Sequence, residues 1–118
     1  MIEKYFLVPA VDPWHAHVVE IDDANLLSGI RDAIGCRYIE IAPMLPGFLS
    51  PPQGVCMVVD EEGWLLDNPV QNKLGTVLCG QPIAGNILFG RRGYRDGEPD
   101  LVGLEQSDID FFTWHMAL

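Results

Sequence analysis

The sequence is poor in basic residues and has no long apolar segment. Seven lysines and arginines stand against 17 aspartates and glutamates, which gives a formal net charge of -10. A chain with this charge repels the phosphates of nucleic acids, so we expect no direct nucleic-acid binding. No apolar run approaches the ~20 residues that a membrane span requires, and the first residues lack the pattern of a secretory signal. The sequence therefore predicts a cytoplasmic protein without a membrane contact.

Cysteine is also scarce. Cys36, Cys56 and Cys79 lie far apart, the count is odd, and no C-x-x-C pair occurs. Each cysteine lies in or beside an apolar segment, so we expect small buried hydrophobic residues in a reducing compartment. No feature around any of them lowers a thiol pKa, which argues against a nucleophilic cysteine.

Motifs of the common enzyme classes are missing as well. The chain has no G-x-S-x-G, H-E-x-x-H, Walker loop or dinucleotide fingerprint. The glycines between Gly80 and Gly93 are spaced for turns rather than for a phosphate cradle. His15 and His17 have a spacing that metals use, but no third or fourth ligand is predictable nearby, which favours a surface pair. We predict a protein that is not an enzyme and has neither cofactor nor metal.

What is present is a globular composition. Hydrophobic residues make up 48% and charged residues 20% of the 118 residues, a length typical of one domain. We therefore predict a single domain over residues 1–118.

The order of the apolar segments predicts an α+β fold. A helix is expected to start at Asp22 and Asp23 and to end at Gly35, and a second helix over residues 105–116 closes the chain. A hairpin turn is expected at 61–63, and a proline-rich loop at 44–54. Strands are expected over residues 4–10, 15–21, 36–43, 55–60, 64–67, 76–80, 85–90 and 100–104. The result is a mainly antiparallel sheet with one helix after strand 2 and a C-terminal helix.

Two polar segments supply the candidate ligand-binding residues. "DNPVQN" carries amides that donate and accept hydrogen bonds and so suit a base edge or a ribose, and Pro69 stiffens this segment. "GRRGYRDG" is expected to form a loop with guanidinium groups for phosphate and an aromatic ring for stacking. The alternative is that the first segment is turn chemistry and that the arginines neutralise neighbouring acids. The candidate site residues are Asn68, Asn72, Arg91, Arg92, Tyr94 and Arg95.

Several segments together resemble a known family. The segments are "GCRYIEIAPML", "VCMVVDEEGWLLDNPVQN", "IAGNILFG" and the acidic helix start "LEQSDID". They are similar to a small phage and bacterial domain of unknown function, with its Y-I-E strand, E-E-G hairpin and P-x-N segment. The resemblance runs from about Lys4 to Phe112, with Arg37 in place of a usual glycine and Trp64 in place of a lysine. It implies an accessory protein of a phage or mobile element with no assigned activity.

The resemblance also implies that the chain acts by binding. Small phage accessory proteins without catalytic motifs either sequester nucleotide immune signals or occupy DNA-binding host proteins as acidic mimics. The acids here lie in turns and at helix starts, where local structure accounts for them, and this favours the first role. We predict a viral counter-defence sponge that binds a small anionic, nucleotide-like ligand as a homo-oligomer in the host cytoplasm. The alternative is an acidic inhibitor whose partner is a basic host protein.

Overall fold

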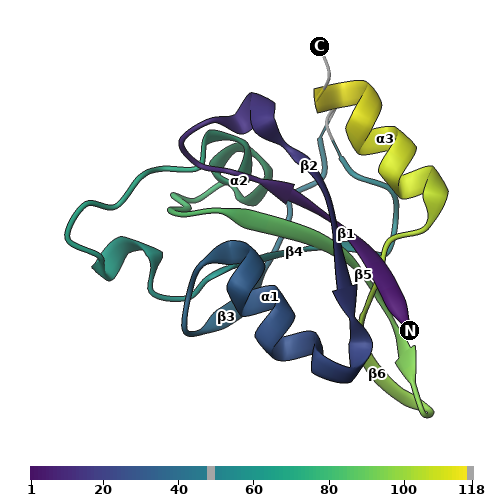
Figure 1. Ribbon diagram of the computed structural model, residues 1–118. Coiled ribbons are helices and arrows are strands. Elements are labelled where there is room, and N and C mark those ends of the chain that lie inside the picture. The colour runs from purple at the N-terminus through teal and green to yellow at the C-terminus, as the bar shows by residue number, and fades with distance from the viewer. Residues whose placement is uncertain (48–49, 117–118) are drawn as a thin grey trace.

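The computed structural model describes residues 1–47 and 50–116 (Figure 1). The strands are β1 (Ile2–Val8), β2 (His17–Asp22), β3 (Ile39–Ala42), β4 (Val55–Asp60), β5 (Ile87–Arg95) and β6 (Glu98–Val102). The helices are α1 (Leu26–Ile34), α2 (Lys73–Cys79) and α3 (Gln106–Met116), and short 3-10 turns lie at Pro13–His15, Asp23–Asn25 and Gly63–Leu65. The α+β class, the helix after strand 2 and the C-terminal helix are confirmed.

The sheet is antiparallel and has the strand order β2-β1-β5-β4-β3. The first part of β5 lies between β1 and β4, where Phe89 has Phe6 on one side and Met57 on the other. The last part of β5 turns back as a hairpin with β6. Asp96 and Gly97 form that turn with positive φ angles of 50° and 81°, the geometry that matches the twist of a two-residue hairpin.

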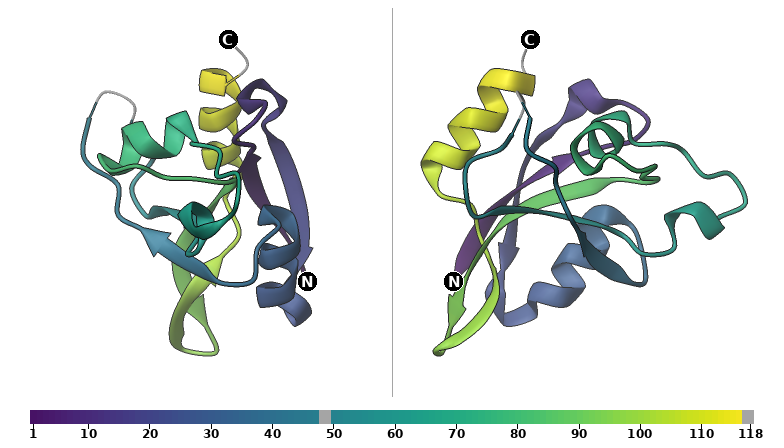
Figure 2. Two further views of the ribbon diagram at one scale, coloured as in Figure 1. Left: turned by 90° about the vertical axis from the view of Figure 1, so that its left-hand side faces the viewer. Right: turned by 180° about the vertical axis from the view of Figure 1, so that it is seen from behind.

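Helices cover both faces of the sheet, with α1 on one side and α2 on the other (Figure 2, left). Side chains of the central strands alternate between two apolar clusters, as the two-residue period of a strand requires. In β4, for example, Met57 and Val59 pack under α2 and α3, whereas Val58 packs under α1. Because both faces are covered, β4 is apolar at successive positions, as its sequence predicts.

The first helix follows its sequence signals closely. The Asp22 carboxylate accepts a hydrogen bond from the N–H of Ala24 at 3.0 Å, before α1 begins. Gly35 ends the helix in the left-handed conformation at φ 83°, and its N–H donates to the carbonyl of Arg31 at 2.7 Å. Ile30 and Ile34 are the buried positions of the helix. The predicted helix is confirmed in type and in its end at Gly35, whereas its expected start at Asp22 and Asp23 is a 3-10 turn over Asp23–Asn25 and α1 itself begins at Leu26.

The predicted hairpin strand at residues 64–67 is wrong. β3 and β5 already occupy both edges of β4, so no edge is left for a returning strand. Instead Gly63–Leu65 is a short 3-10 turn. Gly63 packs so closely on the carbonyl of Ala84 that a Cβ would clash there. From this turn the chain runs outward in a segment that projects from the body of the protein (Figures 1 and 2).

The predicted strand at residues 76–80 is also wrong, because these residues belong largely to α2. Asn72 caps this helix: its Oδ1 accepts a hydrogen bond from the N–H of Gly75 at 3.0 Å. Leu78 and Cys79 are buried against the sheet. Capping and burial outweigh the strand propensity of the local sequence.

The prediction that the arginine-rich segment "GRRGYRDG" forms a loop is also wrong. Arg91 to Arg95 continue β5 and pair in register with β6, Arg95 opposite Glu98. The proline-rich loop is confirmed for its described residues, and residues 48–49 lie outside the described part. His15 lies in a 3-10 turn and His17 begins β2. In the described ranges no group of three or more His, Cys, Asp or Glu side chains is placed to hold a metal, and no helix is long and apolar enough to cross a membrane.

Candidate functional site

Arg91 binds an acid at the start of α3. Its Nε and Nη2 donate to the two carboxylate oxygens of Asp108 at 2.9 and 2.6 Å, and its Nη1 donates to the carbonyl of Gln53 at 2.9 Å. The Asp108 side chain is fully buried, and its Oδ2 also accepts the N–H of Glu105. The Arg91 guanidinium therefore holds the pKa of Asp108 below its ordinary value. This arginine ties β5 to α3.

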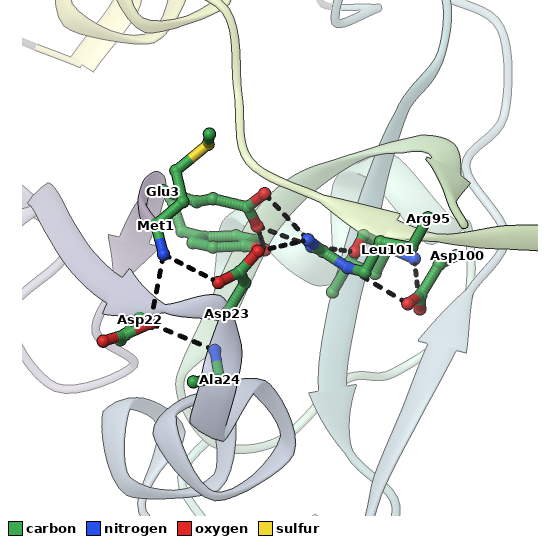
Figure 3. A network of polar contacts seen from close by, with 9 residues as sticks. Met1, Glu3, Asp22, Asp23, Ala24, Arg95, Asp100 and Leu101 are labelled. Carbon is green, nitrogen blue, oxygen red and sulfur yellow. Dashed lines mark hydrogen bonds and ion pairs between the residues drawn. The ribbon is translucent and has the colours of Figure 1, made fainter. Parts of the chain in front are cut away.

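Arg95 is enclosed by three carboxylates (Figure 3). Its Nη2 and Nη1 donate to the two oxygens of Glu3 at 2.6 and 3.0 Å. Nη1 also donates to Asp23 at 3.1 Å, Nε donates to Asp100 at 3.1 Å, and Nη2 donates to the carbonyl of Leu101 at 2.8 Å. A guanidinium has five N–H donors, so Arg95 has none left for a phosphate.

The charge around Arg95 stays negative. Arg95 and the Met1 amino group, which is 2.9 Å from Asp23, face the four carboxylates of Glu3, Asp22, Asp23 and Asp100. The Arg95 hydrogen bonds lower the pKa of Glu3, so this carboxylate is ionised at neutral pH. The Tyr5 hydroxyl donates a hydrogen bond to Glu3 at 2.9 Å. Burial, and to a smaller extent this hydrogen bond, raises the pKa of Tyr5 well above its ordinary range. The cluster joins the β5–β6 hairpin to β1 and to the start of the α1 region.

Asn72 is likewise committed to the fold. Its side chain is buried, and besides capping α2 its Nδ2 donates to the carbonyls of Val8 and Gly85, both at 3.1 Å. These carbonyls lie on segments 64 and 13 residues away. Asn68, by contrast, is exposed in the projecting segment between Gly63–Leu65 and α2. The sequence shows two similar amides, but only one of them is accessible to a ligand.

The structure does not bring the six predicted residues into one pocket. Asn72 lies beside Gly85, before β5 begins, whereas Arg95 ends that strand, eight residues and about 26 Å after Ile87 at ~3.3 Å per residue. Arg92 and Tyr94 are exposed and share one face of β5. Arg91 and Arg95 alternate with them along the strand, and their guanidinium groups are bonded to carboxylates of α3 and of the β1–α1 region respectively. Only Arg92 and Tyr94 lie together at the surface of β5.

Sequence reasoning missed two grooves that flank α1. The first groove, of about 490 Å³, lies between α1, β3, β4 and β6. Its lining consists of Leu26, Leu27, Ile30, Ile39, Glu40, Ile41, Val58, Asp100 and Leu101. The floor is apolar, the charged residues in this lining are both acids, and no Lys or Arg belongs to it. Leu27 and Ile41 are each 49% exposed beside this groove, a property that the sequence alone does not show.

The second groove lies on the β2 side of α1 and has a volume of about 610 Å³. Its lining consists of Val19, Glu20, Ile21, Asp22, Asn25, Ser28, Gly29, Asp32 and Ala33. The charged residues in this lining are again acids only. Both described grooves therefore suit a cationic or apolar group better than an anion.

The projecting segment after β4 carries a further surface feature. Leu65 is 78% exposed, Leu66 56% and Trp64 47%. The Trp64 indole N–H donates to the carbonyl of Pro82 at 3.1 Å, which fixes the ring against the body of the protein. Three consecutive apolar side chains thus lie between the exposed acids Glu61 and Asp67 along one protruding stretch.

Comparison with known protein families shows which family the chain belongs to. The family described as "Domain of unknown function (DUF3846)" matches residues 6–115. The chain belongs to this family. Among curated protein sequences, no match is found. The DUF3846 match agrees with the expected resemblance to a domain of unknown function, and it brings no assigned activity.

One solved structure has a similar fold. It is the crystal structure of the small RNA methyltransferase HEN1, with a TM-score of 0.66 and 19% sequence identity. The match covers 95% of this chain but only 16% of that protein. At this identity the likeness shows the fold alone.

Proposed function

We propose that this DUF3846 chain is a non-catalytic binding protein that holds a basic protein partner on its acidic surface. The observation that supports the proposal is that the two half-buried arginines are paired within the chain, whereas most of the acids are exposed. Arg91 and Arg95 are neutralised by internal ion pairs, while the polar lining of both grooves beside α1 is acidic where it is charged. The exposed acids are Glu20, Asp22, Asp32, Glu40, Glu61, Asp67, Asp96, Glu98, Asp100, Glu105 and Asp110. Such a surface attracts basic proteins and steers their association.

The test is co-purification at low salt followed by elution with rising salt. We expect a basic protein in stoichiometric amount, released as salt screens the contact. Glu40→Lys, in the first groove, should reduce its recovery, whereas Asp110→Lys makes the same charge change on α3 and should leave it unchanged. Equal loss in both variants would mean that net charge alone, and not a site, determines the binding.

A second function is supported by Arg92 and Tyr94. Both are exposed on one face of β5, where a guanidinium and an aromatic ring suit a phosphate and a base. This pair supports the hypothesis that the chain is a phage counter-defence protein, which forms a homo-oligomer and sequesters a nucleotide. Mass spectrometry of small molecules released by heat tests it. An intact nucleotide in stoichiometric amount, lost in Arg92→Ala and Tyr94→Ala, would replace the basic-partner proposal.

A further inference from the structure

The third strand has a free edge. β3 is the last strand in the order β2-β1-β5-β4-β3, and its pairing partner is β4, from Ile39 opposite Asp60 to Ala42 opposite Met57. In the ranges 1–47 and 50–116 no strand pairs with its outer edge. Backbone N–H and C=O groups on such an edge form a template on which another extended chain can pair.

This edge borders the first groove. Ile39 and Ile41 line the groove together with Val58, the register partner of Ile41 on β4. Leu27 of α1 forms the opposite wall, and both it and Ile41 are 49% exposed. A chain that pairs with β3 places every second side chain on the α1 side of the sheet, beside Ile39 and Ile41 at the rim of the groove.

The charges select the kind of chain. Glu40 lies on β3 itself, and Asp100 lines the same groove from β6. Lys or Arg side chains on an incoming strand compensate Glu40, because opposite charges on neighbouring strands stabilise a pair. Asp100 adds only to the negative charge of the groove, since β6 pairs with β5 and Asp100 is already bonded to Arg95. A second copy of this chain is a poor occupant, since it adds another net charge of -10 and another Glu40 to the same edge.

We propose that the free edge of β3 and the adjoining groove bind an extended peptide segment in which apolar residues alternate with Lys or Arg. Main-chain hydrogen bonds to β3 provide affinity, and the apolar side chains of β3 together with Glu40 provide selectivity. This inference rests on the proposed function, because it names the form in which a basic partner presents itself.

The experiment uses a labelled heptapeptide of alternating lysine and valine, titrated with the full chain and followed by fluorescence anisotropy. Two matched peptides serve as controls: one has N-methyl groups on alternate amides, and the other has glutamate in place of lysine. We expect saturable binding of the first peptide and none of the glutamate peptide. The N-methylated peptide should bind roughly tenfold more weakly, because it cannot form the edge hydrogen bonds.

Chain variants locate the site. Glu40→Lys and Ile41→Lys should each weaken binding of the lysine-valine peptide by about tenfold or more. Asp110→Lys, on the opposite side of the sheet, should leave the affinity unchanged. Hydrogen exchange should show added protection at residues 39–42 in the complex, because their outward amides become bonded.

The outcomes separate the two proposals. Equal affinity for the N-methylated peptide, or protection confined to residues outside 39–42, would overturn strand addition at β3 while leaving a basic partner in place. A lysine-valine peptide that does not bind, with no basic protein recovered at low salt, would overturn both.

Discussion

The two faces of the sheet differ in how completely helices cover them. Under α2 and α3 the aromatic rings of Phe6, Phe89 and Phe112 stack, with Phe112 centroid distances of 5.2 Å to Phe6 and 4.4 Å to Phe89. On the other face α1 is the covering helix, and grooves lie on both of its sides. A nine-residue helix is only about 14 Å long and about 10 Å wide, too small to cover five strands spaced ~4.8 Å apart.

This difference separates stability from access. The closed face concentrates apolar burial, a buried ion pair and the Asn72 cap, so changes there should act on folding. The α1 face leaves apolar and acidic groups within reach of solvent, so changes there should act on binding.

The largest effect is expected at the aromatic stack. Phe112→Ala removes the ring that contacts both Phe6 and Phe89, and should lower the free energy of unfolding by roughly 3–5 kcal/mol. Trp114→Ala is the control on the same helix, since Trp114 is 70% exposed and its loss should change stability by less than about 0.5 kcal/mol. Urea unfolding followed by circular dichroism measures both. Similar losses in the two variants would contradict a sealed face under α3.

A somewhat smaller loss is expected at the buried ion pair. Asp108→Asn leaves the Arg91 guanidinium without its counter-charge, which should lower the free energy of unfolding by about 3 kcal/mol. Arg91 retains 20% exposure of its side chain, which places the loss at the low end for a broken buried pair. Asp110→Asn, an exposed position two residues later, should have little effect. If Asp108→Asn and Asp110→Asn unfold at the same urea concentration, the buried ion pair does not contribute to stability as proposed.

The Asn72 cap should come next. Asn72→Ala removes the α2 cap and leaves the buried carbonyls of Val8 and Gly85 without their donor, a loss of about 2 kcal/mol. Asn68→Ala is the matched amide change at an exposed position and should leave the melting temperature unchanged. If Asn68→Ala proves as destabilising as Asn72→Ala, the two amides are not divided between fold and surface as the structure indicates.

Acid should weaken the protein through its paired carboxylates. The pKa values of Asp108 and Glu3 are lowered by Arg91 and Arg95. In acid the unfolded chain therefore binds more protons than the folded chain, so these groups stabilise the fold above their unfolded pKa of about 4. That stability should disappear as pH falls through their lower folded values. Urea titrations from pH 6 to 3 should show this decline in the free energy of unfolding. The decline should be shallower in Glu3→Gln. An unchanged slope in that variant would mean that Glu3 does not contribute to the pH dependence.

The smallest effect on stability is expected on the α1 face. Leu27 is half exposed beside the first groove, so Leu27→Ser should change the free energy of unfolding by no more than about 0.5 kcal/mol. The same change should weaken binding of the lysine-valine peptide, because it removes one apolar wall. A large loss of stability with intact peptide binding would reverse the division between the two faces. Ile30→Ala is the matched buried position of α1 and should be clearly destabilising.

Local sequence was enough to predict the elements whose signals are local. The acids at 22–23 and Gly35 predicted α1 to within a few residues at its start and correctly at its end, and the apolar run at 55–60 predicted β4. The strands at 64–67 and 76–80 were predicted wrongly because propensity and turn residues do not show which sheet edges are already occupied. Residues 64–67 are excluded from the sheet because β3 and β5 occupy both edges of β4. Residues 76–80 are largely helical because Asn72 caps α2.

The candidate site shows even more clearly what the sequence predicts and what the tertiary structure decides. The sequence determined that arginines cluster at 91–95, that acids outnumber bases, and that the chain belongs to a particular fold class and family. Only the tertiary structure decided that Arg95 faces Glu3, 92 residues away, and that Arg91 faces Asp108. A guanidinium binds a carboxylate of its own chain through the same hydrogen bonds that it would offer to a phosphate. The fold brings that carboxylate within about 3 Å, and so it decides which anion the arginine holds.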